Sequence, residues 1–195
     1  MENGFPVGTD INRVKEFYNK GVRYITLCHS SNNDICDSST DKKGPEHDGL
    51  SDFGAEVVKE MNKLGMMIDV SHISDKSFYD VIKLSKAPVI ASHSSVRAIA
   101  HHNSNMTDEM IKKLAEKGRV IQITFGSYFI RGDFNRKSEE IDKYLSDNHI
   151  ARYSEEGKNF VDNYLKNDPM KPGTVKDVAD HIDHVVKLVG IDHVG

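Results

Sequence analysis

Two features of the sequence predict an α/β fold built on a parallel sheet. Short apolar runs recur along the chain, and each is followed by a segment of helical character. Three of these runs end on a histidine, and they span residues 24–29, 66–72 and 88–93. A single histidine after a strand is more often structural than functional. Because parallel α/β folds place their chemistry at the carboxyl ends of the strands, three together predict a functional site at that edge.

The first predicted helix and strand precede a long polar loop. Residues 10–20 are expected to form a helix that ends at Gly21, shortly before the strand at 24–29. Residues 30–49 are rich in Asn, Asp, Ser and Gly. A loop of that length in a compact domain is usually functional or mobile.

The next two helix–strand units carry capping signals. Ser51 can cap a helix that Gly65 ends, and the strand at 66–71 follows at once. Apolar residues at three- and four-residue spacing give this helix one buried stripe, formed by Phe53, Val57, Met61 and Leu64. Ser74 can cap the following helix, which is expected to end near Lys86.

A further unit follows the strand at 88–93. Residues 94–106 look irregular, after which Thr107 is expected to cap a helix that ends at Gly118. The strand at 119–125 completes this unit and runs into Gly126, Ser127 and Tyr128.

The pattern then changes. Residues 131–173 carry many charges and a weak helical period, so we interpret them as a helical insertion on the ligand side of the sheet. Thr174 is expected to cap a last helix that continues to about Val189. Residues 190–195 are typical of a strand that is just beginning.

These elements amount to about four βα units and the edge of another. A closed (β/α)8 barrel needs eight such units in about 250 residues. We therefore predict a partial TIM, or (β/α)8, barrel with helices outside its parallel strands. Residues 1–195 are expected to form one such domain, truncated at both ends.

The composition excludes several classes of function. Lys and Arg number 26 against 30 Asp and Glu, and the net charge of −4 argues against a nucleic-acid scaffold. No apolar run approaches the roughly 18 residues that a membrane span requires. The two cysteines, Cys28 and Cys36, form no disulfide framework and are interpreted as unreactive thiols. The compartment stays open between cytoplasmic and exported.

The histidines are candidate metal ligands. His72 and His93 are one βα unit apart, so they are expected on adjacent strands, where they could share an ion. His29 is either a third ligand or a donor that polarises a substrate carbonyl. Glu2 is the nearest candidate for a bridging carboxylate, and its alternative interpretation is a solvated residue near the N-terminus.

Other polar residues carry weaker signals. His181 and His184 could bind metal from the last helix, but an exposed polar face is the preferred interpretation. His101 and His102 lie in the irregular stretch and are expected to be solvated. Asp69 lies within an apolar strand and needs a partner there. It forms either a hydrogen bond that orients a metal ligand or a structural bond to a neighbouring loop.

Several segments resemble the membrane (renal) dipeptidase family and occur in the order found in that family. The segments are Glu2-Asn3-Gly4 and residues 25–29, 49–54, 57–66, 68–72, 92–95 and 180–184. Together they cover most of the chain outside residues 131–173.

The resemblance implies a zinc dipeptidase with a TIM barrel and a two-metal site. It implies that Glu2 bridges both zinc ions and that His72 and His93 ligate one of them. It also implies that His29 contacts the substrate and helps to stabilise the tetrahedral intermediate. The expected substrates are dipeptides, often with a D-residue at the C-terminal position. Family members are commonly homodimers, and some are membrane-anchored.

Three family features have no counterpart in this sequence. The His-x-Asp pair of the first strand would precede Met1, and the catalytic-site aspartate would follow Gly195. The arginine that binds the substrate carboxylate in the family aligns with Ser104, and the resemblance does not place Arg97 in that role. Two alternatives therefore stay open: another metal-dependent amidohydrolase, such as an acyl-amino-acid deacylase, and a non-catalytic metal-binding homologue.

Overall fold

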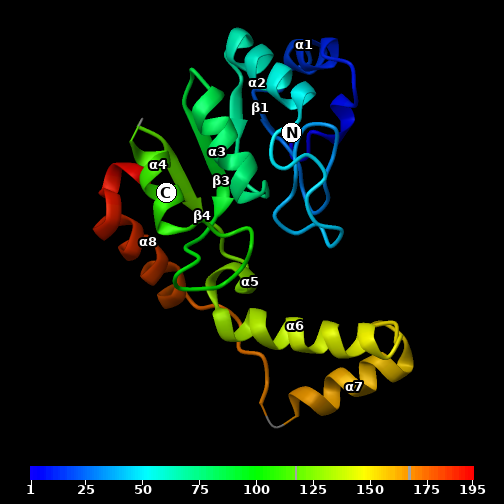
Figure 1. Ribbon diagram of the computed structural model, residues 1–195. Helices are drawn as coiled ribbons and strands as arrows, with labels where there is room; N and C mark the ends of the chain where they lie inside the picture. The colour runs from blue at the N-terminus through cyan, green and yellow to red at the C-terminus, as the bar shows by residue number, and fades with distance from the viewer. Residues whose placement is uncertain (117, 167) are drawn as a thin grey trace.

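A parallel four-stranded sheet lies at the centre of the protein (Figure 1). The computed structural model describes residues 1–116, 118–166 and 168–195. The strands follow one another in the order β1-β2-β3-β4, and every neighbouring pair is parallel. Their bounds are Tyr24–Thr26 for β1, Met67–Asp69 for β2, Val89–Ser94 for β3 and Val120–Ile123 for β4. The predicted α/β class with parallel strands is confirmed.

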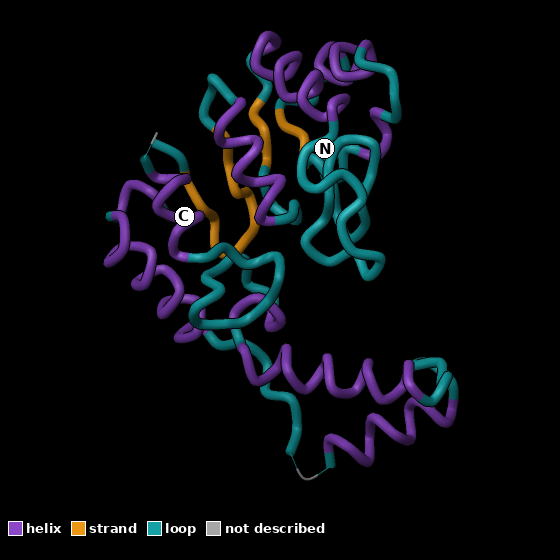
Figure 2. The backbone as a smooth tube through the Cα atoms, viewed as in Figure 1, coloured by secondary structure: helices purple, strands orange, loops and turns teal. Residues whose placement is uncertain are grey.

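Helices alternate with the strands and lie outside the sheet (Figure 2). Contacts join α1 to α2, α2 to α3, α3 to α4 and α4 to α8, so the row of helices follows the order of the strands. These helices are Asn12–Asn19 (α1), Asp52–Leu64 (α2), Asp75–Leu84 (α3), Asp108–Ala115 (α4) and Val175–Val189 (α8). None of the helices in the described part of the chain is both long and apolar enough to cross a membrane.

The predicted helix caps are present. The side chains of Ser51, Ser74 and Thr107 each accept a hydrogen bond from the backbone N–H three residues later. Thr174 forms a capping box with Asp177 at the start of α8. At the other end of α2, a left-handed glycine stops the helix, as expected. These local signals set where the helices begin and therefore which side chains face the core.

The core lies between the strands and the outer helices. Each strand contributes an apolar side chain that is almost fully buried, and these are Ile25, Ile68, Ala91 and Ile121. From the predicted stripe of α2, Val57 and Met61 are fully buried, while Phe53 and Leu64 are partly buried and pack against the same cluster. Burial of this stripe holds α2 against the sheet.

Some boundaries differ from those expected. β1 and β2 each end three residues before the histidine that closes the apolar run, whereas His93 lies inside β3. The strand expected to begin within residues 190–195 starts only at their end, because Ile191–His193 form a short 3-10 helix, η2. After it, Val194 forms one parallel bridge with Ile121, so this end of the chain lies beside β4. Ladder pairing, which no local pattern encodes, decides where each strand stops.

Two short elements were not expected. A 3-10 helix, η1 (Phe5–Val7), follows the N-terminal residues, and a single helical turn, α5 (Ser127–Ile130), follows β4. A proline lies near the start of η1. It fits there because backbone N–H groups in the first turn have no partner within the helix, so the proline costs no hydrogen bond.

A helical hairpin extends away from the sheet (Figure 1). It consists of α6 (Gly132–Asp147) and α7 (Glu155–Leu165). The rings of Tyr144 and Phe160 stack between the two helices, with centroids 3.9 Å apart and planes 4° from parallel. The segment 131–173 is therefore largely helical, and its interpretation as an insertion stays a prediction.

Candidate metal centre

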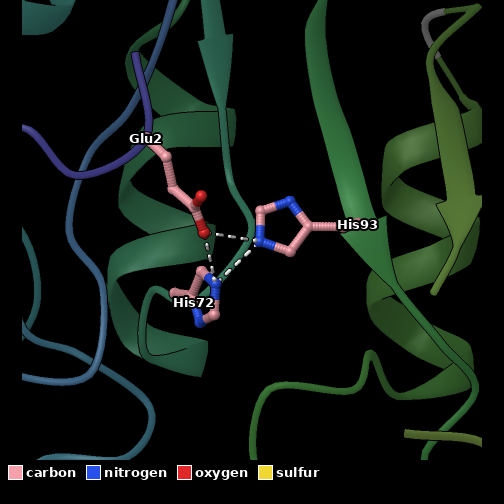
Figure 3. Close-up of side chains that lie close together, drawn as sticks. All are labelled: Glu2, His72 and His93. Atoms are coloured by element: carbon pink, nitrogen blue, oxygen red, sulfur yellow. Dashed lines mark hydrogen bonds and ion pairs between the residues drawn. The ribbon is translucent and has the colours of Figure 1, made fainter. Parts of the chain in front are cut away.

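Glu2, His72 and His93 converge at the carboxyl ends of the strands (Figure 3). Their ligand atoms all lie within 4.8 Å of one another. Oε1 of Glu2 is 3.5 Å from Nε2 of His72 and 3.5 Å from Nε2 of His93. His29 lies beside them, with Nε2 3.3 Å from the same carboxylate oxygen. The four predicted site residues are therefore neighbours in space, and their roles stay predictions.

Glu2 reaches the site because the chain before η1 pairs with β1. The N-terminal ammonium donates to the carbonyl of Tyr24 at 2.8 Å, and the N–H of Thr26 donates to the carbonyl of Met1 at 3.0 Å. Gly4 lies so close to the backbone after β1 that an added Cβ would be 2.6 Å from the Leu27 carbonyl oxygen. This close approach holds the segment in place and carries Glu2 to the sheet edge.

His72 occupies a left-handed backbone conformation, with φ of 68°. Such a conformation costs a β-carbon residue on the order of 1–2 kcal/mol, so surrounding contacts must hold it. The N–H of Ser39 donates to the His72 carbonyl at 2.8 Å, which ties the turn to the polar loop. The backbone turns sharply here, and the imidazole is brought over the end of β2.

The electrostatics keep His72 neutral. Burial lowers its pKa to about 4, and the imidazoles of His93 and His29 act in the same direction. Glu2 opposes this shift but does not reverse it. At neutral pH the imidazole is therefore uncharged, and this is the form that ligates a metal ion.

The donor set fits a zinc ion. Two imidazole nitrogens and a carboxylate oxygen are ligands that zinc prefers. Nε2 of His72 and Nε2 of His93 are only 2.7 Å apart, so two lone pairs face each other unless a proton or a cation lies between them. Within the described ranges, no second group of three such ligands occurs.

The centre opens into a pocket of about 420 Å³. Loops and α5 supply the wall opposite the metal ligands, and its residues are Ser30, Thr40, His102, Ser104, Tyr128 and Phe129. A volume of this order is typical of small-molecule sites. Of these wall residues, only Ser104 is linked to the site by the sequence, through the family alignment. The others come from loops and from the single turn α5, whose packing no periodic pattern predicts.

His102 is part of this wall and is partly buried, so it is less solvated than expected. Its ring lies 4.7 Å from that of Phe129, and its Nδ1 accepts the N–H of Ser104 at 3.1 Å. Burial lowers its pKa. His101, the neighbouring residue, is exposed, as expected.

His181 is fully buried, so the preferred interpretation of an exposed polar face was wrong for it. Its Nδ1 accepts the N–H of Val96 at 3.0 Å, and its Nε2 donates to the carbonyl of Ile130 at 3.3 Å. It therefore joins α8 to the loop after β3. His184 instead contacts Asp108 at 2.9 Å. His181 lies between Val178 and Val185 on one face of α8, and this spacing is the signal that could have placed it in the core.

Arg97 lies in a separate pocket of about 400 Å³. Its guanidinium forms two hydrogen bonds of 2.7 Å with the carboxylate of Asp75. Ser104, at the position of the family arginine, is buried, and its hydroxyl lies 2.9 Å from that of Ser39. Arg97 is therefore held by Asp75 and does not line the metal pocket.

Both cysteines are buried and free. Burial raises the pKa of the Cys36 thiol well above its ordinary value. A thiol that stays protonated is a poor nucleophile and a poor ligand, which agrees with the interpretation of Cys36 as an unreactive thiol.

The model of the membrane dipeptidase family, peptidase family M19, matches residues 1–195. Among curated proteins, the uncharacterized dipeptidase C965.12 of Schizosaccharomyces pombe is 34% identical over 200 residues, covering 100% of this chain and 39% of that protein. Dipeptidase verJ of Clonostachys rogersoniana is 37% identical over 182 residues, covering 93% and 37%. The chain thus spans less than two fifths of the length of these curated relatives.

Solved structures show the same relationship. The probable dipeptidase PvdM from Pseudomonas aeruginosa superposes with a TM-score of 0.84 at 29% identity, covering 100% of this chain and 55% of that one. A metallo peptidase from Rhodobacter sphaeroides, liganded with a phosphinate mimic of L-Ala-D-Ala, gives a TM-score of 0.74 at 25% identity, covering 100% and 47%. With the parallel sheet and outer helices, this similarity confirms the predicted partial TIM barrel.

Proposed function

Because the chain belongs to the membrane dipeptidase family, peptidase family M19, we propose that it forms the metal-binding part of a zinc dipeptidase. The convergence of Glu2, His72 and His93 on one point beside a pocket carries this proposal. When bound, zinc supplies Lewis acidity and lowers the pKa of water toward neutrality. The residues of this chain hold the ion, place it at the pocket and orient the substrate.

Glu2 is proposed to bridge two zinc ions. Its Oε1 faces His72 and His93, and the other carboxylate oxygen points away from them (Figure 3). A carboxylate can ligate one ion through each oxygen, so the second oxygen is free to serve a second ion. In this proposal the two histidines serve the first ion only.

His29 is proposed to contact the substrate. Its imidazole is 43% exposed, lies in the pocket wall and has its Nδ1 2.7 Å from the hydroxyl of Ser30. When Ser30 donates to Nδ1, the ring proton is on Nε2, which can then donate to the oxyanion of the tetrahedral intermediate. Removal of one such donor typically reduces kcat by about 10²–10³-fold.

The proposed substrates are dipeptides, including those with a C-terminal D-residue. The R. sphaeroides structure holds a mimic of L-Ala-D-Ala, and this chain shares the fold of that protein at 25% identity. The family resemblance also leads us to propose a homodimer, which light scattering of the purified protein would test.

Metal content and hydrolysis should be measured together. Zinc per chain is determined by mass spectrometry, and turnover is assayed on matched L-X–L-X and L-X–D-X dipeptides and on N-acetyl amino acids. We expect bound zinc and cleavage of dipeptides, with loss of metal in His72→Ala and His93→Ala. His184→Ala is the matched control, because this histidine contacts Asp108 and lies outside the metal pocket.

Each alternative has its own outcome. Cleavage of N-acetyl amino acids without dipeptides would replace the proposal by a deacylase. Bound zinc with no turnover of any substrate would replace it by a non-catalytic metal-binding homologue. Full metal content in both His72→Ala and His93→Ala would contradict the ligand assignment itself.

A further inference from the structure

Asp69 is a fully buried carboxylate at the end of β2, surrounded by donors from β1, from β3 and from the turn after β2. Its Oδ2 accepts the hydroxyls of Thr26 at 2.6 Å and Ser92 at 2.5 Å. Its Oδ1 accepts the N–H and the hydroxyl of Ser71 at 3.1 and 2.8 Å, and the N–H of Ser92 at 3.0 Å. Every partner is a donor, which is the arrangement that stabilises a buried, ionised carboxylate.

Burial by itself raises the pKa of Asp69. The hydrogen bonds from Ser92, Thr26 and Ser71 outweigh this effect and hold the pKa below its ordinary value. An ionised carboxylate has no proton to donate, so it can only accept from its neighbours.

Ser92 lies between Asp69 and the metal ligand His93. Its Oγ is 2.5 Å from Oδ2 of Asp69 and 2.7 Å from Nδ1 of His93. A serine hydroxyl has a single proton. Because the carboxylate can only accept, that proton points to Asp69, and the Ser92 oxygen accepts the proton that Nδ1 of His93 carries. The ring nitrogen that remains unprotonated is Nε2, which is the atom that faces Glu2 and His72.

We infer that Asp69 is a positioning residue that acts through Ser92 to hold His93 in the Nδ1–H tautomer, so that Nε2 always presents its lone pair to the metal. The same carboxylate also fixes the backbone of this ligand, because the Ser71 hydroxyl that donates to Asp69 accepts the N–H of His93 at 3.1 Å. The tautomer and the orientation of the ligand are thus set before any ion binds.

The two oxygens of Asp69 are not equivalent, and their different partners predict the effect of Asp69→Asn. Oδ1 receives two backbone N–H groups, from Ser71 and Ser92, which cannot rotate. Oδ2 accepts hydrogen bonds only from hydroxyl groups, and these can rotate. In Asp69→Asn the amide oxygen must therefore stay at the Oδ1 position, and the NH2 group then faces Ser92. The Ser92 hydroxyl must accept from it and donate to Nδ1 of His93, which moves the ring proton to Nε2.

The tautomer can be measured in the metal-free chain. Long-range ¹H–¹⁵N spectra of the imidazole nitrogens distinguish a protonated Nδ1 from a protonated Nε2. We expect Nδ1–H for His93 in the wild type and in Ser92→Thr, which keeps the hydroxyl. Ser92→Ala should give a mixture of tautomers, and Asp69→Asn should give Nε2–H. Ser95→Ala is the matched control, because it removes a nearby buried hydroxyl whose partner is the Thr124 carbonyl.

Zinc affinity, measured by competition with a chelator, is the second readout and rests on the proposed function. Loss of a hydrogen-bond partner of a metal ligand typically reduces affinity about 10- to 100-fold. We expect a loss of that size in Ser92→Ala and at least as large in Asp69→Asn, with Ser92→Thr and Ser95→Ala near the wild type.

The zinc and tautomer measurements distinguish a failure of the proposed function from a failure of the inference about Asp69. A wild type that binds no zinc would contradict the proposed function, while the tautomer spectra would still decide the inference. A wild-type tautomer in Ser92→Ala, or Nε2–H in the wild type, would overturn the inference even if zinc binds. If Asp69→Asn fails to fold, the pair Ser92→Ala and Ser92→Thr decides it.

Discussion

Nε2 of His72 lies 2.7 Å from Nε2 of His93, and the register of the sheet explains why. β2 and β3 pair with Asp69 opposite Ile90, and the two histidines are separated by the same 21 positions as this pair. His29 stands in the same relation to His72, because Thr26 pairs with Asp69, 43 positions away, and the two imidazole rings lie 4.3 Å apart. These two registers therefore align three histidines near the carboxyl ends of the strands.

The backbone at His72 predicts a difference between two variants that both lose the ligand. His72→Ala keeps a β-carbon on a residue with a φ of 68°, whereas His72→Gly removes the β-carbon. Glycine adopts this conformation without steric cost, so we expect metal-free His72→Gly to be more stable than His72→Ala by about 1 kcal/mol. Urea denaturation of both variants checks this. Equal midpoints would show that the left-handed turn is not a source of strain.

The charge of Glu2 should matter for metal binding and not for folding. Its side chain is 55% exposed, so Glu2→Gln is expected to leave the melting temperature nearly unchanged. The amide oxygen is a weaker ligand, and we expect the zinc affinity to fall by at least about 10-fold, measured by isothermal titration calorimetry. Glu16→Gln, at an exposed ion pair with Lys20, is the control. Undiminished affinity in Glu2→Gln would remove it from the ligand set.

The polar loop should lose stability in acid because of Asp37. Burial raises the pKa of this carboxyl, but the backbone N–H groups of Gly49, Glu46 and His47 outweigh that and lower it below 3.8. The folded state therefore binds the proton more weakly than the unfolded state. The contribution of the ionised Asp37 carboxylate to the stability is complete above pH 3.8. It is lost as the pH falls through the pKa that Asp37 has in the folded state.

Thermal unfolding between about pH 2 and pH 6 tests this expectation. Asp37→Asn should be less stable than the wild type at neutral pH, and the difference should shrink in acid. The carboxylate of Asp37 accepts the three N–H groups at 2.8 to 3.0 Å, and an amide cannot accept all of them equally well. A constant difference at every pH would contradict the role assigned to the charge.

His181 should make the fold sensitive to mild acid. Burial lowers its pKa from 6.5, so the unfolded chain takes up the proton first. The contribution of neutral His181 to the stability is complete above pH 6.5 and declines as the pH falls below that value. His181→Asn, whose side-chain oxygen can accept the N–H of Val96 but does not titrate, should decline less between about pH 7 and pH 5 in thermal melts. Parallel declines of the wild type and the variant would exclude His181 as the cause.

Local signals in the sequence determined the fold class and most of the metal centre. The caps at Ser51, Ser74 and Thr107 and the apolar runs act over a few residues, so they could be recognised in the chain itself. The runs that end on His72 and His93 are both short and apolar, and this similarity placed both histidines at one edge of a parallel sheet. Glu2 was different, because only the family resemblance distinguished it from a solvated residue.

Tertiary structure alone decided the pocket wall and the fate of the remaining histidines. His102 reaches the pocket because an irregular loop packs on Phe129, and His181 is buried because α8 packs against the loop after β3. The five donors that converge on Asp69 come from β1, from β3 and from the turn after β2, so no single segment of the chain reveals them. Contacts between distant segments depend on how the elements dock, and docking is set by the whole core and not by any local pattern.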